Sequence, residues 1–260
     1  MKNAYKSLSN DEVYFISRAE YEKQKVITTS FAQKVFNDKN KSSRILVYLQ
    51  RKGRLLRIEK GKYLLVPLKA PNQQWMPNEF VLASLWMENT PYYIGYNTAY
   101  NYWGFTEQIP QTVFVLNTEK SIKRKIGTVQ YTAVKVASNK IYGLKKITIE
   151  AEKVCISDKE RTLVDYVYKP MGSWEQVENV LADQLPEIHI EKLVQYSIRF
   201  PVESVGKRIG LMLERLGIPE KKLEPLRNSI GTGNSYSTYN PFIASRKGNV
   251  NQKWKVILNG

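Results

Sequence analysis

The sequence predicts an α+β protein, in which a small N-terminal helical unit ending in a β-hairpin precedes a larger mixed α/β domain with C-terminal helices. In the first seventy residues, apolar positions recur at helical spacing and are followed by two short apolar runs on either side of Lys60-Gly61. β-Branched runs of strand length then fill the middle of the chain, and the part after Trp174 returns to helical spacing. These three observations favour two domains over a repeat array.

The composition supports a folded core and excludes several kinds of site. The chain has 260 residues, 42% of them hydrophobic, and no run approaches the roughly 20 apolar residues that span a bilayer. The polar start, MKNAYKSLSNDE, does not have the pattern of a signal peptide. Cys155 and His189 are single residues of their kind, which argues against an internal disulfide, a His/Cys zinc site and a Cys–His catalytic pair. We therefore expect a cytoplasmic protein without metal, cofactor or membrane partner.

The positive charge is concentrated near the N-terminus. The formal net charge is +16. Residues 1–70 carry 16 basic and 6 acidic side chains, a net of +10 in about a quarter of the chain. Concentrated basic charge attracts phosphate backbones. A merely solvated basic surface is the alternative, and the charge alone does not decide between them.

Three short helices are predicted in the first 53 residues. The first is capped by Asn10, follows Val13 and Ile16, and runs to about Lys25. The second is capped within residues 28–30. A turn over residues 37–40 separates it from a third helix, which begins at Ser42 or Ser43 and ends at Gly53.

The third helix is amphipathic. At 100° per residue, one side collects Ser42, Ile45, Leu46 and Leu49, which should pack on the first two helices. The opposite side collects Lys41, Arg44, Tyr48, Arg51 and Lys52. A hairpin follows, with Lys60 and Lys62 at its tip and with Arg54 and Arg57 on the approaching strand.

Three helices followed by a basic hairpin describe a winged helix-turn-helix. A helix of this width enters the major groove of duplex DNA, and the hairpin reaches the adjacent backbone or minor groove. The alternative is that the basic helix face is only solvated. The predicted DNA-contacting residues are Lys41, Ser43, Arg44, Tyr48, Arg51, Lys52, Arg57, Lys60 and Lys62.

The sequence therefore predicts a DNA-binding domain over residues 1–70, a linker over residues 71–77 and a larger α/β domain over residues 78–260. Asn78 caps a helix, NTAYNYW forms another that ends at Gly104, and Ser157 with Glu160 forms a capping box. The predicted strands are TVFVLN, TVQYTAVKVA, KKITIE and KVCIS, with WKVIL closing the chain after four further helices.

The search for catalytic chemistry yields no candidate residues. The aromatic stretch from Trp86 to Phe105 could stack on a ligand, but core packing is the commoner use of such side chains. Glu150, Glu152 and Lys153 resemble the acidic-x-Lys element of some nucleases, yet the position that needs the acid is Ala151. We therefore predict a protein that is not an enzyme.

Four segments together resemble the AbiEi antitoxins, transcriptional regulators of bacterial type IV toxin–antitoxin systems in phage defence. The segments are RIEKGKYLLVP, NTAYNYWGFTEQIPQTVFV, ISDKERTLVDYVY and NQKWKVILN, in this order along most of the chain. The resemblance implies a repressor that binds inverted repeats in its own promoter through a winged helix. It also implies that the larger domain opposes a nucleotidyltransferase-like toxin without a stable complex.

Two other functions stay open at this stage. The larger domain could be a nuclease-like defence enzyme tethered to DNA, which an activity assay with a divalent metal would detect. Alternatively, residues 78–260 could be a protein-interaction module with incidental DNA binding.

Overall fold

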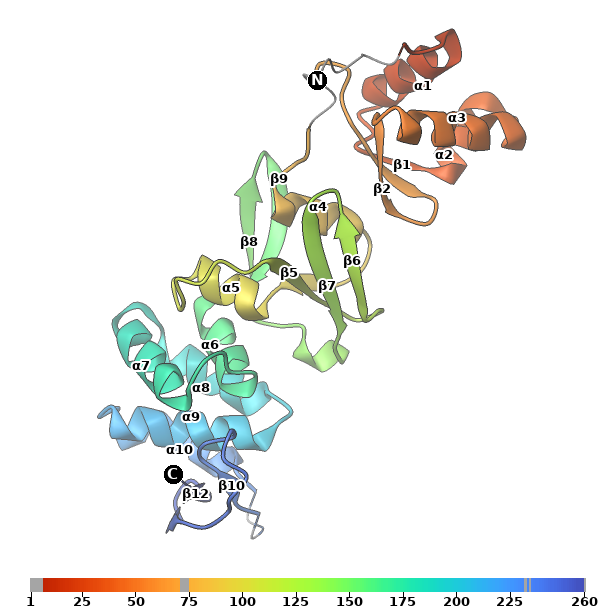
Figure 1. The fold of residues 1–260 in the computed structure, drawn as a ribbon. Coiled ribbons are helices and arrows are strands. Elements are labelled where there is room, and N and C mark those ends of the chain that lie inside the picture. The colour runs from red at the N-terminus through yellow and green to blue at the C-terminus, as the bar shows by residue number, and fades with distance from the viewer. Residues whose placement is uncertain (1–6, 71–74, 232, 234, 260) are drawn as a thin grey trace. The chain divides into compact units, whose positions relative to one another are not determined.

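The computed structural model describes residues 7–70, 75–231, 233 and 235–259, and it shows a mixed α+β protein with several sheets (Figure 1). Its contacts divide the chain into two compact units. Unit 1 comprises Met1–Glu88, Lys123–Tyr131 and Ile149–Glu152. Unit 2 comprises Asn89–Ile122, Thr132–Thr148 and Lys153–Gly260. The predicted boundaries at residues 70 and 78 stay a prediction, and residues 71–74 of the predicted linker lie outside the described residues.

The N-terminal part of unit 1 combines three helices with a small antiparallel sheet. In chain order the elements are α1 (Asn10–Tyr21), β1 (Val26–Thr28), α2 (Thr29–Phe36), α3 (Lys39–Arg51), β2 (Leu55–Glu59) and β3 (Lys62–Leu65). The strand order is β1-β3-β2, and Ile27 pairs with Tyr63. The hairpin predicted around Lys60-Gly61 is confirmed as β2 and β3.

Helix α1 begins and ends earlier than predicted. Its cap is Ser9, not Asn10, because Ser9 and Glu12 form a capping box in which each side chain accepts from the other residue's backbone N–H. The helix ends at Tyr21 rather than near Lys25. A turn over residues 22–25 then leads into β1 (Val26–Thr28), a strand that the sequence analysis missed.

Helix α3 begins three residues before the predicted start. Its cap is Asp38, whose carboxylate accepts from the N–H groups of Asn40 and Lys41. The sequence analysis placed this segment in a turn. The Ser42 hydroxyl lies inside the helix and donates to the carbonyl of Ala32 in α2, 3.0 Å away. The end at Gly53 is confirmed, since this glycine has φ +73°.

One apolar core joins these helices and the small sheet. Its buried members are Phe15, Ile16, Ala19, Ile27, Ala32, Ile45, Leu46, Leu49, Leu55 and Leu65. The predicted core face of α3 is confirmed, because Ser42, Ile45, Leu46 and Leu49 are all buried. On α1, however, Phe15 takes the core position that the sequence analysis gave to Val13, which is 42% exposed.

A six-stranded sheet forms the middle of the chain. Its order is β6-β7-β5-β4-β9-β8, with β4 antiparallel to β5 and parallel to β9. The bounds are β4 (Tyr92–Ile94), β5 (Thr112–Asn117), β6 (Ile122–Ile126), β7 (Val129–Lys135), β8 (Leu144–Ile149) and β9 (Glu152–Ser157). Strands β5, β7, β8 and β9 were predicted, and β4 and β6 were missed. The helices α4 (Glu79–Trp86) and α5 (Tyr96–Tyr102) confirm the predicted cap at Asn78 and the end at Gly104.

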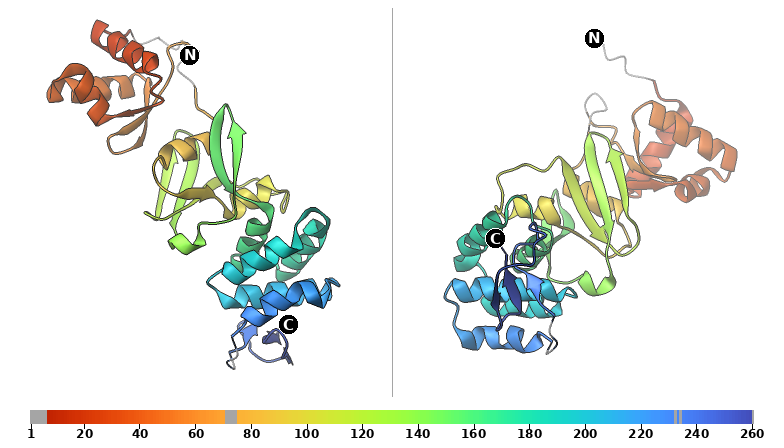
Figure 2. Two further views of the ribbon diagram at one scale, coloured as in Figure 1. Left: turned by 180° about the vertical axis from the view of Figure 1, so that it is seen from behind. Right: turned by 60° about the horizontal axis from the view of Figure 1, so that its bottom comes forward.

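The last hundred residues of unit 2 are mainly helical (Figure 2). The helices are α6 (Lys159–Tyr168), α7 (Trp174–Gln184), α8 (Ile190–Arg199), α9 (Glu203–Arg215) and α10 (Glu220–Ser229). Strands β10 (Ser237–Thr238), β11 (Asn249–Asn251) and β12 (Val256–Leu258) form a small sheet, which confirms the predicted closing strand. Of the described helices, none is long and apolar enough to cross a membrane.

The cap of α6 differs from the prediction. Asp158 caps the helix by accepting from the N–H of Arg161, 2.9 Å away. Ser157 instead pairs with the hydroxyl of Thr162, and Glu160 accepts from the backbone N–H of His189. Most of the aromatic stretch packs in the core, as predicted, because Trp86, Tyr93, Tyr96, Tyr100 and Phe105 are buried.

Candidate nucleic-acid interface

The outer face of α3 is exposed, basic and aromatic. Arg44, Tyr48 and Arg51 are exposed, as is Ser43 on the flank of the same face. They lie opposite the buried row of Ser42, Ile45, Leu46 and Leu49 because buried and exposed positions alternate at the helical period. Within the described chain, no ion pair joins Arg44 to a carboxylate. The buried row of α3 packs against α1 and α2 and holds the helix in place. The basic face on the opposite side stays exposed to solvent.

The β2–β3 hairpin adds a second basic element. Lys60 at the tip and Arg57 on β2 are exposed. The N–H of Thr29, the first residue of α2, donates to the carbonyl of Gly61 at 3.0 Å and so ties the hairpin tip to that helix. Gly61 has φ +73°, and a Cβ on it would lie 3.0 Å from the Thr29 hydroxyl oxygen. Both facts favour glycine at this turn.

Three of the predicted lysines are engaged in ion pairs. Lys41 contacts Asp11 at 2.8 Å, Lys52 contacts Glu12 at 2.6 Å, and Lys62 contacts Glu88 at 3.1 Å. Each carboxylate offsets part of the positive charge that the sequence analysis assigned to the surface. The Lys41 and Lys52 pairs also join α3 to α1, which gives these two lysines a structural role.

Arg54 does not belong to the exposed basic surface. The sequence analysis placed its side chain on the approach to the hairpin tip, but it is 6% exposed and donates to the carbonyl of Pro67 at 3.0 Å. Arg54 also lies one residue before β2 rather than on the strand as predicted, and its side chain turns inward to bind the backbone after β3.

Glu12 is the most buried of the carboxylates that pair with these lysines. Its burial opposes ionisation, but the Lys52 ammonium and the Ser9 N–H outweigh that effect and lower the pKa of Glu12. The carboxylate therefore stays ionised at neutral pH. It anchors the Lys52 side chain and the start of α1 together.

Sequence reasoning missed one basic residue of this region. Lys39 is exposed in the first turn of α3. It was left out because residues 37–40 were assigned to a turn, whereas the helix begins at Lys39. The signal was present in the sequence, since an aspartate directly before a helical run is a common cap.

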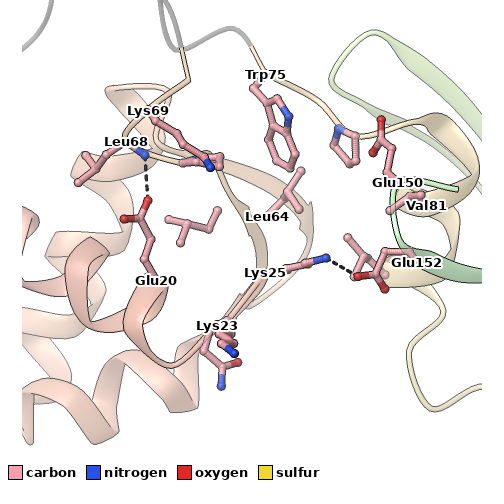
Figure 3. Close-up of a pocket in the computed structure, with 15 residues that line it drawn as sticks. Glu20, Lys23, Lys25, Leu64, Leu68, Lys69, Trp75, Val81, Glu150 and Glu152 are labelled. Carbon is pink, nitrogen blue, oxygen red and sulfur yellow. Dashed lines mark hydrogen bonds and ion pairs between the residues drawn. The ribbon is translucent and has the colours of Figure 1, made fainter.

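A pocket of about 790 Å³ lies elsewhere in unit 1 (Figure 3). Its walls come from the end of α1, strand β3, residues 67–69 and 75–77, helix α4 and the turn between β8 and β9. Leu64, Val81 and Trp75 contribute apolar surface, and the ion pair between Lys25 and Glu152 borders the pocket. This volume is in the range of small-molecule sites.

The side chains that the sequence analysis considered for catalysis show no catalytic arrangement among the described residues. Glu152 pairs with Lys25, and Glu150 accepts from the N–H of Asn78 at 3.1 Å. Burial raises the pKa of the Cys155 thiol, and His189 is exposed at the start of α8. Among the described residues, no group of three or more His, Cys, Asp or Glu side chains could hold a metal ion.

Comparison with known proteins gives a likeness to solved structures but no match by sequence. No family model matches the chain, and no curated protein matches it. The crystal structure of the RV2827C protein from Mycobacterium tuberculosis is similar, with a TM-score of 0.65 over 98% of this chain and 94% of that one. The two sequences are 14% identical, so the likeness concerns the fold alone.

Proposed function

We propose that the N-terminal part of the chain is a winged helix-turn-helix that binds duplex DNA, with α3 as the recognition helix and the β2–β3 hairpin as the wing. The observation that carries this proposal is the exposed face of α3, where Arg44, Tyr48 and Arg51 lie opposite the buried row. An α-helix fits the major groove, and arginine binds guanine edges with two hydrogen bonds. Lys60 and Arg57 on the wing are exposed, and in this proposal they contact phosphates.

We further propose that the protein is a transcriptional repressor and type IV antitoxin of the AbiEi kind. The support is the order of the four sequence segments that resemble this family, together with the proposed DNA-binding element at the N-terminus. In this proposal the protein represses its own promoter at inverted repeats. The larger domain opposes a nucleotidyltransferase-like toxin without a stable complex, and no cofactor or metal is needed.

DNA binding by the full-length protein should weaken steeply with salt. If the basic residues of α3 and the wing neutralise roughly five to seven phosphates, log affinity should fall against log salt with a slope of about −4 to −6. Fluorescence anisotropy with a labelled random duplex at several salt concentrations measures this slope. A slope near zero would contradict DNA binding through this basic surface.

The antitoxin part of the proposal predicts that neutralisation is separable from repression. A full-length chain with Arg44→Glu and Arg51→Glu, expressed from an unrelated promoter, should lose operator binding because both cations become anions. It should still restore growth to cells that express the toxin encoded beside it. If this variant is folded but fails to restore growth while the wild type succeeds, neutralisation requires DNA binding, and the division of roles is wrong.

A further inference from the structure

The hairpin formed by β6 and β7 carries a second cluster of positive charge. Residues 123–131, its turn and the adjoining parts of both strands, contain three basic side chains and no acidic one. Their contacts place them in unit 1 together with α3 and the wing, although they lie far along the chain. Lys123 and Lys125 on β6 are exposed. The fold therefore adds cations to the N-terminal basic region that the order of the sequence keeps apart from it.

The third basic side chain, Arg124, joins this hairpin to the wing. Its guanidinium donates to the carbonyl of Ile58 on β2 at 2.8 Å. On β7, the Tyr131 hydroxyl donates to the carbonyl of Glu79 in α4 at 2.9 Å, and its ring packs edge-on against Trp86. Both strands of the hairpin are thus held by contacts within unit 1. A backbone held in this way leaves only the lysine side chains to be ordered when a ligand binds.

A groove of about 880 Å³ runs along α3, the wing and this hairpin. Its lining includes Gln50 in the last turn of α3, Arg57 on β2 and Lys125 on β6. None of the described residues that line it is acidic. Within the described chain, no ion pair joins Arg57, Lys123 or Lys125 to a carboxylate. The groove thus differs from the pocket of Figure 3, whose border carries both lysines and glutamates, and its charge complements an anion.

We propose that the β6–β7 hairpin is a third DNA-contacting element, in which Lys123 and Lys125 bind the phosphate backbone of the duplex that α3 and the wing engage. This inference rests on the proposed DNA-binding function. A duplex backbone fits the arrangement because it presents a row of phosphates, and the free cations are spread from α3 over the wing to β6. Contacts of this kind position the protein on DNA and do not read its bases.

Lysines at the edge of a sheet have another use, since they discourage pairing with a second chain. Strands β6 and β8 are the two end strands of the six-stranded sheet, and β8 carries the exposed Lys145 and Lys146. Replacing the pair of lysines on either strand removes the same amount of charge. The pair on β8 therefore provides the matched control.

The test measures binding of the full-length protein to a labelled random-sequence duplex by fluorescence anisotropy at several salt concentrations. We expect Lys123→Gln with Lys125→Gln to weaken binding about tenfold at low salt and to make the salt slope shallower by about two, because two phosphate contacts are lost. Lys145→Gln with Lys146→Gln should keep the wild-type slope and change affinity by less than about twofold, because salt screens charges that do not contact the duplex.

The inference is overturned if the β6 variant keeps the wild-type slope, or if the β8 variant loses as much slope and affinity as the β6 variant. In both cases the wild type still binds DNA, so the proposed function stands. Failure of the wild type to bind the duplex would instead overturn the proposed function, and this inference with it. Circular dichroism checks that both variants are folded.

Discussion

Replacing Asp165 with alanine should lower the free energy of unfolding by about 3–5 kcal/mol, the largest loss that we expect from a single change in this protein. Asp165 accepts from Arg161 at 2.7 Å, and both side chains are buried. Burial raises the pKa of Asp165, and the Arg161 guanidinium opposes that shift. Without the carboxylate, a guanidinium with 0% exposure would lack its counter-ion.

The surroundings of Arg161 cannot replace that carboxylate. Among the described residues, Arg161 also contacts the Tyr93 hydroxyl at 3.0 Å, the Lys140 carbonyl at 3.3 Å, and the rings of Tyr93, Tyr142 and Phe200 at 5.7, 4.7 and 5.1 Å. These groups are polar or π-rich but carry no negative charge. They solvate the guanidinium and do not neutralise it.

Two controls distinguish a lost counter-ion from a lost contact. The double variant Arg161→Met with Asp165→Leu removes both charges and should lose less stability than Asp165→Ala alone. Glu191→Ala breaks the exposed pair with Lys222 and should change stability little, because water screens exposed charges. Urea unfolding followed by circular dichroism compares all three. Equal losses for Asp165→Ala and the double variant would show that packing, not the unpaired charge, sets the cost.

The amphipathic order of α3 could be predicted from the sequence because helical geometry alone decides it. Once Ser42 and Leu49 lie on one side, the period of 3.6 residues places Arg44 and Arg51 on the other. The same reasoning correctly gave the hairpin at Lys60-Gly61, where the turn chemistry is local. Features that depend on residues close together in the chain could therefore be predicted from the sequence.

Features that depend on contacts between distant parts of the chain could not be predicted from the sequence. The strand Val26–Thr28 is three residues long and forms only by pairing with β3, thirty-odd residues later. Likewise, the partners of Lys41 and Lys52 lie in α1, so the sequence pattern could not show that their charges are offset. The cap of α3, Asp38, could have been predicted from the sequence, but it was assigned to a turn because Asp favours both positions.

Arg44→Ala and Arg51→Ala should each weaken binding to the operator by about 1–3 kcal/mol and relax its sequence preference, if α3 reads base edges as proposed. Arg44 lies in the middle of the exposed face, and Arg51 lies two turns further along it. Because an arginine that binds a guanine edge discriminates between base pairs, its loss should affect the specific duplex more than a random one.

Lys60→Ala at the hairpin tip provides the contrast, because a contact to a phosphate carries no base information. It should weaken specific and random duplexes to the same extent and lower the salt slope by about one. Lys146→Ala, an exposed lysine on β8, serves as the control for a loss of positive charge alone. Parallel titrations of all four variants on both duplexes decide between the roles. If the arginine variants lose equal affinity for both duplexes, α3 positions the protein on the backbone and another element must read the sequence.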